Sequence, residues 1–322
     1  MESKGLVKEG ALLLFVSLVF NSFGLLSFLY IVPLLLFAIH GGKRRAELLL
    51  LLCSFLILLL EIFHQRDMEM SKLNAALLFV SLYFPWSLSA AGIVWLETEH
   101  DHRLIRRLYC TLAPALVLLL FLALFIATDR ALLAELHEGF QNALAASLGE
   151  MLASFLPGVE MSVIAEIVLL TLMSMLMPLL LVCICACCFI YTSIRHSRES
   201  DWEQTVMAFE YPPNAVWGFI VSWALVLLLH FVPAADALVA VIVNIALAEG
   251  VLYAIEGFSV VFARLRRRNG RVKSMSVFIV LAVMAIALPG INFIVILGLP
   301  LLGVLESFFD LKKIGALYED HS

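Results

Sequence analysis

The sequence predicts an all-α, polytopic transmembrane helix bundle of about eight to ten membrane segments, with an outer amphipathic helix, in a single integral membrane domain over residues 1–322. Of the 322 residues, 63% are hydrophobic and only 15% are charged, against roughly 45–50% and about 25% in soluble domains. Several apolar runs reach the roughly 20 residues needed to cross a bilayer. These runs are continuous rather than alternating, so the spanning structure they predict is helical.

The apolar runs divide the chain into candidate segments. In order they are 6–20, 24–40, 46–63, 73–96, 108–128, 161–193, 215–232, 236–263, 274–288 and 291–309. The first pair is separated only by "NSFG" and the last pair only by "LPGIN". Each pair is either a hairpin of two short segments or one long interrupted span, and this choice separates ten crossings from eight.

The distribution of basic residues predicts the orientation, because loops rich in Lys and Arg face the cytoplasm. Lys43–Arg45, Arg103–Arg107 and the run "RLRRRNGRVK" at 264–273 are the basic loops, whereas the 129–160 connection is acidic. With hairpins at both ends of the chain, both termini are cytoplasmic. We therefore expect ten segments.

Two regions are not predicted to span. In the outer insertion 129–160, leucine or phenylalanine recurs every fourth residue from Leu132 to Leu152, which is typical of an amphipathic helix that lies on the membrane surface or caps the bundle. The segment 195–214 is charged, contains Trp202 and ends in "EYPPN", so we expect a cytoplasmic loop.

The most unusual pattern is a pair of glutamates in an apolar segment. Glu249 and Glu256 are seven residues apart in 236–263, so both share one helix face with Tyr253. A carboxylate is costly in hydrocarbon, so this face is expected to point into the bundle, beside a stripe of small residues, Ala246, Gly250 and Ala254. It is either a solute-binding or proton-coupling site near the bilayer midplane, or a buried packing contact.

The two interruptions give further candidate site residues. Asn21 and Asn292 lie in matching positions of the first and last long apolar regions. Broken helices often line solute sites in transporters, but tight hairpin turns at the outer surface are the interpretation that this topology favours.

Other reactive side chains give weak signals. "VCICACC" at 182–188 lacks an accompanying histidine, and His100 and His102 in "ETEHDHR" fit a solvated turn better than a metal site. No P-loop, GxSxG or HExxH motif is present. We therefore expect no enzymatic activity, no catalytic residue, no metal and no cofactor.

The C-terminal third resembles the YybS-like family of uncharacterised bacterial multipass membrane proteins. The resemblance is carried by "LYAIEGFSVVFARLRRR" and "LGLPLLGVLESFFDLKK". The matching positions are Asn244, Tyr253, Gly257, Gly303, Asp310 and Lys312. The start of the chain, with Pro33 and the turn "HGGKRR", is more distantly similar to the substrate-binding S subunits of energy-coupling-factor transporters and to the rod-shape membrane protein MreD. These resemblances imply a location in a bacterial inner (cytoplasmic) membrane.

Two functions follow as expectations. The first is a small-solute binding or transport subunit whose substrate-binding residues are Glu249, Glu256, Tyr253, Asn244, Asn21 and Asn292. The second is a non-catalytic scaffolding subunit of a cell-envelope complex. The expected partners are the lipid bilayer, a membrane protein or energising subunit and an unknown small solute, with no nucleic acid. A polar cavity at Glu249 would favour the first function, and a packed helix contact there would favour the second.

Overall fold

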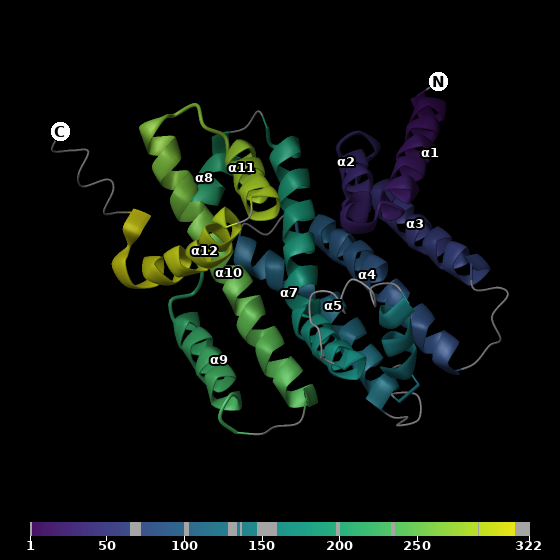
Figure 1. Cartoon of the computed structure of the whole chain (residues 1–322). Helices are drawn as coiled ribbons and strands as arrows, with labels where there is room; N and C mark the ends of the chain where they lie inside the picture. The colour runs from purple at the N-terminus through teal and green to yellow at the C-terminus, as the bar shows by residue number, and fades with distance from the viewer. Residues whose placement is uncertain are drawn as a thin grey trace. The chain divides into compact units, whose positions relative to one another are not determined.

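The computed structural model describes residues 2–64, 72–99, 103–127, 134–135, 137–146, 160–197, 200–232, 236–288 and 290–312 (Figure 1). Every element in these ranges is helical. The chain separates into two compact units, residues 1–102 with 107–173, and residues 103–106 with 174–322. The all-α fold class is confirmed, while the single membrane domain over 1–322 stays a prediction.

The first unit contains α1 (Glu2–Asn21), the 3₁₀ helix η1 (Gly24–Tyr30), α2 (Ile31–Gly41), α3 (Lys43–His64), α4 (Lys72–Glu97), α5 (Leu104–Ala127) from residue 107 on, and the start of α7 (Met161–Arg195). Gly10, near the start of α1, contacts the Phe37 ring near the end of α2. The two helices are therefore antiparallel, and the interruption at 21–24, where Gly24 has φ +50°, is a hairpin turn.

Small side chains let α2, α3 and α4 pack closely in the first unit. Gly92 of α4 lies against Leu35 of α2 and Leu50 of α3, both of which are fully buried. The buried Tyr30 hydroxyl contacts the Pro85 carbonyl and lies 2.6 Å from the Ser89 hydroxyl. At one end of this core, the Lys43 ammonium pairs with the Glu97 carboxylate at 2.7 Å.

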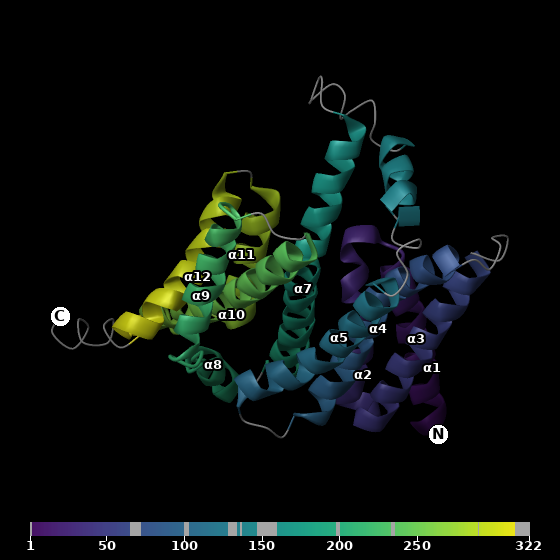
Figure 2. The same cartoon turned by 90° about the horizontal axis from the view of Figure 1, so that it is seen from below.

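The second unit holds the rest of α7 with α8 (Ser200–Met207), α9 (Ala215–Leu229), α10 (Asp236–Arg268), α11 (Ser274–Ala287) and α12 (Ile291–Phe309). α9 and α10 lie side by side in both ribbon views (Figures 1 and 2). They are antiparallel, because Ser222 faces Glu249 while Phe219 faces Tyr253. α12 packs against both α10 and α11.

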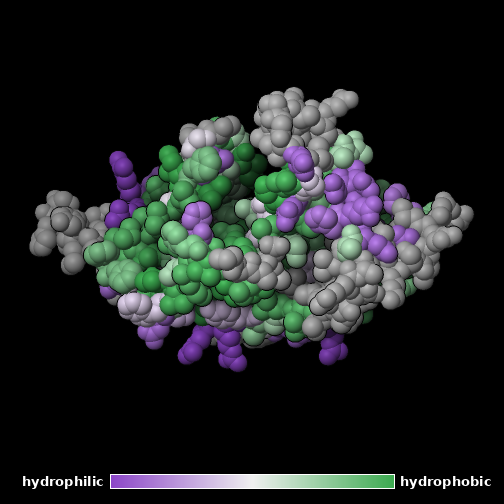
Figure 3. Space-filling model, turned by 60° about the horizontal axis from the view of Figure 1, so that its bottom comes forward, coloured by the Kyte–Doolittle hydropathy of each residue, from purple (hydrophilic) through white to green (hydrophobic). Residues whose placement is uncertain are grey.

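The helix lengths and their surfaces fit a membrane protein. Within the described residues, four helices are long and apolar enough to cross a bilayer: Lys43–His64, Ser162–Arg195, Leu238–Arg268 and Asn292–Phe309. Ser27–Gly41, Ala215–Leu229 and Ser274–Ala287 are apolar but shorter. Large hydrophobic side chains such as Leu51, Phe55, Trp217 and Val221 are exposed, and Figure 3 shows extensive apolar areas on the face it presents. An extensive apolar surface is unfavourable in water, whereas lipid can cover it without this cost.

The segment 195–214 is not the plain loop that its charge predicted. Its residues 200–207 form α8, in which Trp202 and Val206 are buried against Phe262 of α10 and Val277 of α11. The Trp202 indole donates to the Ser193 hydroxyl at 3.1 Å. The Glu203 carboxylate accepts the Ser274 amide at the start of α11, at 3.0 Å, so α8 stabilises both neighbours.

The outer insertion is partly described. Residues 137–146 are helical, as the leucine spacing predicted. Leu144 is buried with Ile164 and Ala165 of α7, and Phe140 packs beside them. One apolar face of this helix thus contacts the bundle, while most of the remaining 129–160 region lies outside the described residues.

Candidate functional site

Glu249 lies at a contact between two helices. The Ser222 hydroxyl of α9 donates to the Glu249 Oε2 atom at 2.9 Å. Gly218, one turn earlier on α9, makes room for the carboxyl, because a Cβ atom there would lie 3.0 Å from Oε1. The side chain faces a neighbouring helix, as the sequence predicted, but it is only half-buried. The carboxyl fills a notch in α9.

Tyr253 lies one turn further along the same face and is fully buried. Its ring packs edge-on against Tyr211, with centroids 4.9 Å apart, and against Phe219 at 5.1 Å. Tyr253 thus packs between aromatic rings at a position between Glu249 and Glu256 on α10.

Glu256 is more deeply buried than Glu249, with only 2% of its surface exposed. Its Oε1 atom accepts the Tyr211 amide at 3.3 Å, and its Oε2 atom has no hydrogen-bond partner among the described residues. Glu256 is thus enclosed within the second unit, where the backbone of Tyr211, in the segment before α9, covers it.

Lys312, just beyond α12, lies beside Glu256. Its ammonium donates to the Phe209 carbonyl, and its backbone amide donates to the Glu306 carboxylate at 3.1 Å. Burial lowers the pKa of Lys312, and the carboxyls of Glu306, Glu256 and Glu210 act in the opposite direction. The end of α12 is thereby fastened to α10 and to the 209–211 segment.

The three asparagines have local structural roles or lie elsewhere. The Asn244 side chain accepts the Met177 amide at 3.0 Å, next to Pro178 in α7, and donates to the Ala240 carbonyl at 2.8 Å. The Asn292 side chain accepts the amides of Gly290 and Phe293, and so caps the turn before α12. Asn21 is the last residue of α1, in the first unit.

The close helix approach is not at the predicted small-residue stripe. A side chain at Gly250 would meet nothing within 4 Å. Instead, a Cβ atom at Gly257 would overlap the Leu299 carbonyl of α12, and one at Gly303 would overlap the Tyr253 carbonyl of α10. The two backbones therefore touch where α12 crosses α10. In the sequence, only the resemblance to the YybS-like family pointed to Gly257 and Gly303.

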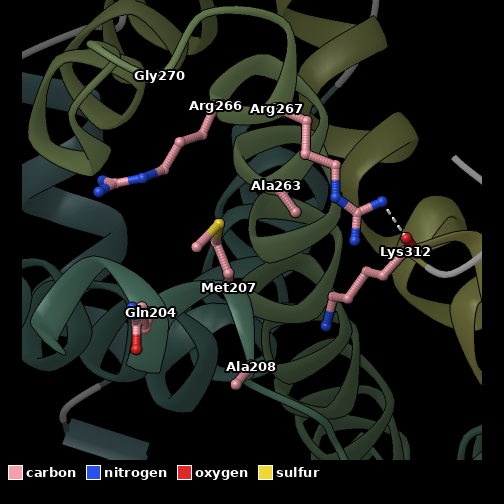
Figure 4. Close-up of a pocket in the computed structure, with 8 residues that line it drawn as sticks. All are labelled: Gln204, Met207, Ala208, Ala263, Arg266, Arg267, Gly270 and Lys312. Atoms are coloured by element: carbon pink, nitrogen blue, oxygen red, sulfur yellow. Dashed lines mark hydrogen bonds between the residues drawn. The ribbon is translucent and has the colours of Figure 1, made fainter. Parts of the chain in front are cut away.

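An open pocket of about 430 Å³ lies at the C-terminal end of α10 (Figure 4). Its cationic residues are Arg266, Arg267 and Lys312, and Met207 and Ala263 form part of its apolar lining. The Arg266 guanidinium pairs with Glu203 at 3.3 Å, and the Arg267 guanidinium donates to the Lys312 carbonyl. Glu249 does not line this pocket.

Sequence reasoning missed several residues of this site. Ser222, Tyr211, Glu306 and the pairing of Lys312 depend on contacts between segments far apart in the chain. The proline pair in "EYPPN" was the one sequence feature that marked the segment before α9. Prolines indicate where a helix ends, but they do not specify which residue accepts the Tyr211 amide.

The metal-ligating candidates give no site in the described part of the chain, where no group of three His, Cys, Asp or Glu residues could hold an ion. Cys183, Cys187 and Cys188 are buried in α7. His100 and His102 lie outside the described residues.

The fold and site define a helical membrane protein. The acidic face of α10 packs against neighbouring segments, and basic residues cluster at the C-terminal end of α10. Comparison with protein-family models, curated proteins and solved structures finds no match to this chain. The resemblance to the YybS-like family therefore stays a prediction, as do the more distant similarities.

Proposed function

We propose that this chain is a non-catalytic scaffolding subunit of a membrane complex in the cell envelope. The observation that carries the proposal is the setting of Glu249, whose carboxyl fills a notch at Gly218 and accepts a hydrogen bond from Ser222. A carboxyl that meets its partner within the protein compensates part of the cost of leaving water.

The rest of the acidic face supports the same function. Tyr253 is enclosed by two aromatic rings, and Glu256 is covered by the Tyr211 backbone. A solute site at this position needs a cavity lined by these side chains, whereas the open pocket described above is lined by other residues. The α10 face therefore serves to join α9, α10 and the end of α12.

The charged ends of the helices are the surfaces that a scaffold presents to other proteins. Arg264 and Arg268 are exposed at the end of α10, Arg271 is exposed just beyond it, and Glu97 is exposed at the end of α4. By contrast, Arg107 interacts within the protein. Its guanidinium carbon lies 3.9 Å from the Trp95 ring centroid, and the guanidinium donates to the Trp95 carbonyl. Exposed charge at a membrane boundary steers partner association more than it adds to affinity.

Native electrophoresis of gently solubilised membranes tests the proposal, with the chain tagged at its natural expression level. We expect the wild-type chain to migrate within an assembly larger than itself, and Glu249→Gln to behave identically, because an amide oxygen still accepts from Ser222. Gly257→Leu, which separates α10 from α12, should release the chain from the assembly. Migration of the wild-type chain alone would contradict the proposal.

A ligand screen provides the second arm. Purified protein is heated with a library of small solutes, and the melting temperature is recorded for wild type and Glu249→Gln. We expect no solute to stabilise wild type selectively. A solute that stabilises wild type and loses that effect in Glu249→Gln would establish the solute-binding function instead.

A further inference from the structure

The pocket at the end of α10 has a cation, Arg267, that no carboxylate of the described residues balances. Arg266 is paired with Glu203, and Lys312 lies near the carboxyls of Glu306, Glu256 and Glu210. Arg267 differs from both, because its guanidinium donates to a backbone carbonyl, and no described carboxylate pairs with it. More than a third of the Arg267 residue surface is exposed.

The chain beside the pocket adds further positive charge. Arg264, Arg268, Arg271 and Lys273 are exposed in the same 264–273 run. In the described structure, Lys273 reaches the Ser197 carbonyl rather than a carboxylate. A run of exposed cations of this kind attracts anions and raises their local concentration.

The position and lining of the pocket restrict the anion further. The pocket lies where the candidate span Leu238–Arg268 ends, so it is at a membrane boundary. Figure 4 shows Arg267 and Lys312 on one side and Gln204 on the other, with Met207 between them. A polar rim with an apolar floor fits a ligand that has an anionic head and a less polar body.

We propose that this pocket binds a phosphate-bearing group, held by the Arg267 guanidinium and attracted by the 264–273 run. Arginine presents parallel N–H donors that match phosphate oxygens in geometry. Basic clusters next to the end of a membrane helix bind anionic lipid headgroups. The same chemistry would hold a free phosphate compound from solution. This site uses none of the α9–α10 contacts, but the exposed arginines of the 264–273 run are shared with the surface that we propose for partner proteins.

The test measures retention of phosphatidylglycerol by the purified full-length protein with native mass spectrometry, after exchange into mixed detergent micelles at about 0.5 M salt, where surface attraction is largely screened. The variants are Arg267→Gln, Arg267→Lys and the matched control Arg268→Gln. Arg268→Gln removes the same charge from an exposed side chain that does not line the pocket. Size-exclusion chromatography and melting temperature check that each variant is folded.

We expect Arg267→Gln to reduce lipid affinity by about fivefold or more, Arg267→Lys to fall between it and wild type, and Arg268→Gln to change affinity less than about twofold. A second arm replaces the lipid with inorganic phosphate and glycerol phosphate. Arg267-dependent binding in this arm alone would assign the site to soluble phosphate compounds. If the variants at 267 and 268 lose affinity equally, or neither loses any, the proposal is wrong.

Discussion

At the scale of single residues, each glutamate of α10 has a different role in packing. Glu249 accepts a hydroxyl hydrogen bond from the neighbouring helix, whereas Glu256 accepts a backbone amide and keeps one oxygen without a partner in the described structure. Sequence spacing predicted that both share a face with Tyr253, because two helical turns separate them. The sequence could not predict the partners Ser222 and Tyr211, because they lie in other segments of the chain.

Glu249→Gln is expected to change the free energy of unfolding by less than about 1 kcal/mol, because the amide oxygen accepts from Ser222 as the carboxyl does. Ser222→Ala removes the donor and should cost about 1 kcal/mol. Thermal unfolding in detergent, compared with wild type, measures both. A loss of several kcal/mol in Glu249→Gln would show that the negative charge itself stabilises the fold.

Lys312 predicts a pH dependence. Its pKa is lowered in the folded protein, so between that pKa and the ordinary lysine value the unfolded chain binds more protons, and stability rises with pH. Glu256→Gln removes a carboxyl that acts against this lowering, so the rise should be steeper in that variant. Melting temperatures at several alkaline pH values test this. In a Lys312→Met background, Glu256→Gln should no longer change how the melting temperature depends on pH.

At the scale of elements, the apolar runs predicted the long helices well. The predicted segment 236–263 corresponds to α10 over Asp236–Arg268, and 291–309 to α12. Length and hydropathy are sufficient here, since a span must satisfy its own backbone. α8 was missed because eight residues with two acids read as a loop, and only its burial of Trp202 against α10 makes it an ordered element.

The crossing of α10 and α12 depends on two glycines. Gly257→Ala and Gly303→Ala should each destabilise the protein by about 1–3 kcal/mol, because the added methyl meets backbone rather than a movable side chain. Gly250→Ala is the matched control in the same helix. Its site is open, so better helix propensity should stabilise by roughly 0.5–1 kcal/mol. Equal effects at 250 and 257 would contradict this crossing.

At the scale of the whole molecule, the basic runs predict both termini and the 264–273 loop on the cytoplasmic side. The hairpin at 21–24 supports this prediction for the N-terminal end, because α1 and α2 are antiparallel. Reporter fusions at residues 4 and 318 and within 264–273 check it. Cytoplasmic signal at all three positions is expected, and periplasmic signal at both termini would instead establish eight spans.

The proposed scaffolding role depends on Glu249 lying in a helix contact, and cysteine chemistry tests that placement most directly. In a chain with its six native cysteines replaced, Ser222→Cys and Glu249→Cys should form a disulfide under mild oxidation in membranes, and Glu249→Cys alone should resist a water-soluble thiol reagent from either side. Rapid labelling of Glu249→Cys, without a disulfide in the double variant, would place residue 249 in a water-filled site and contradict the account.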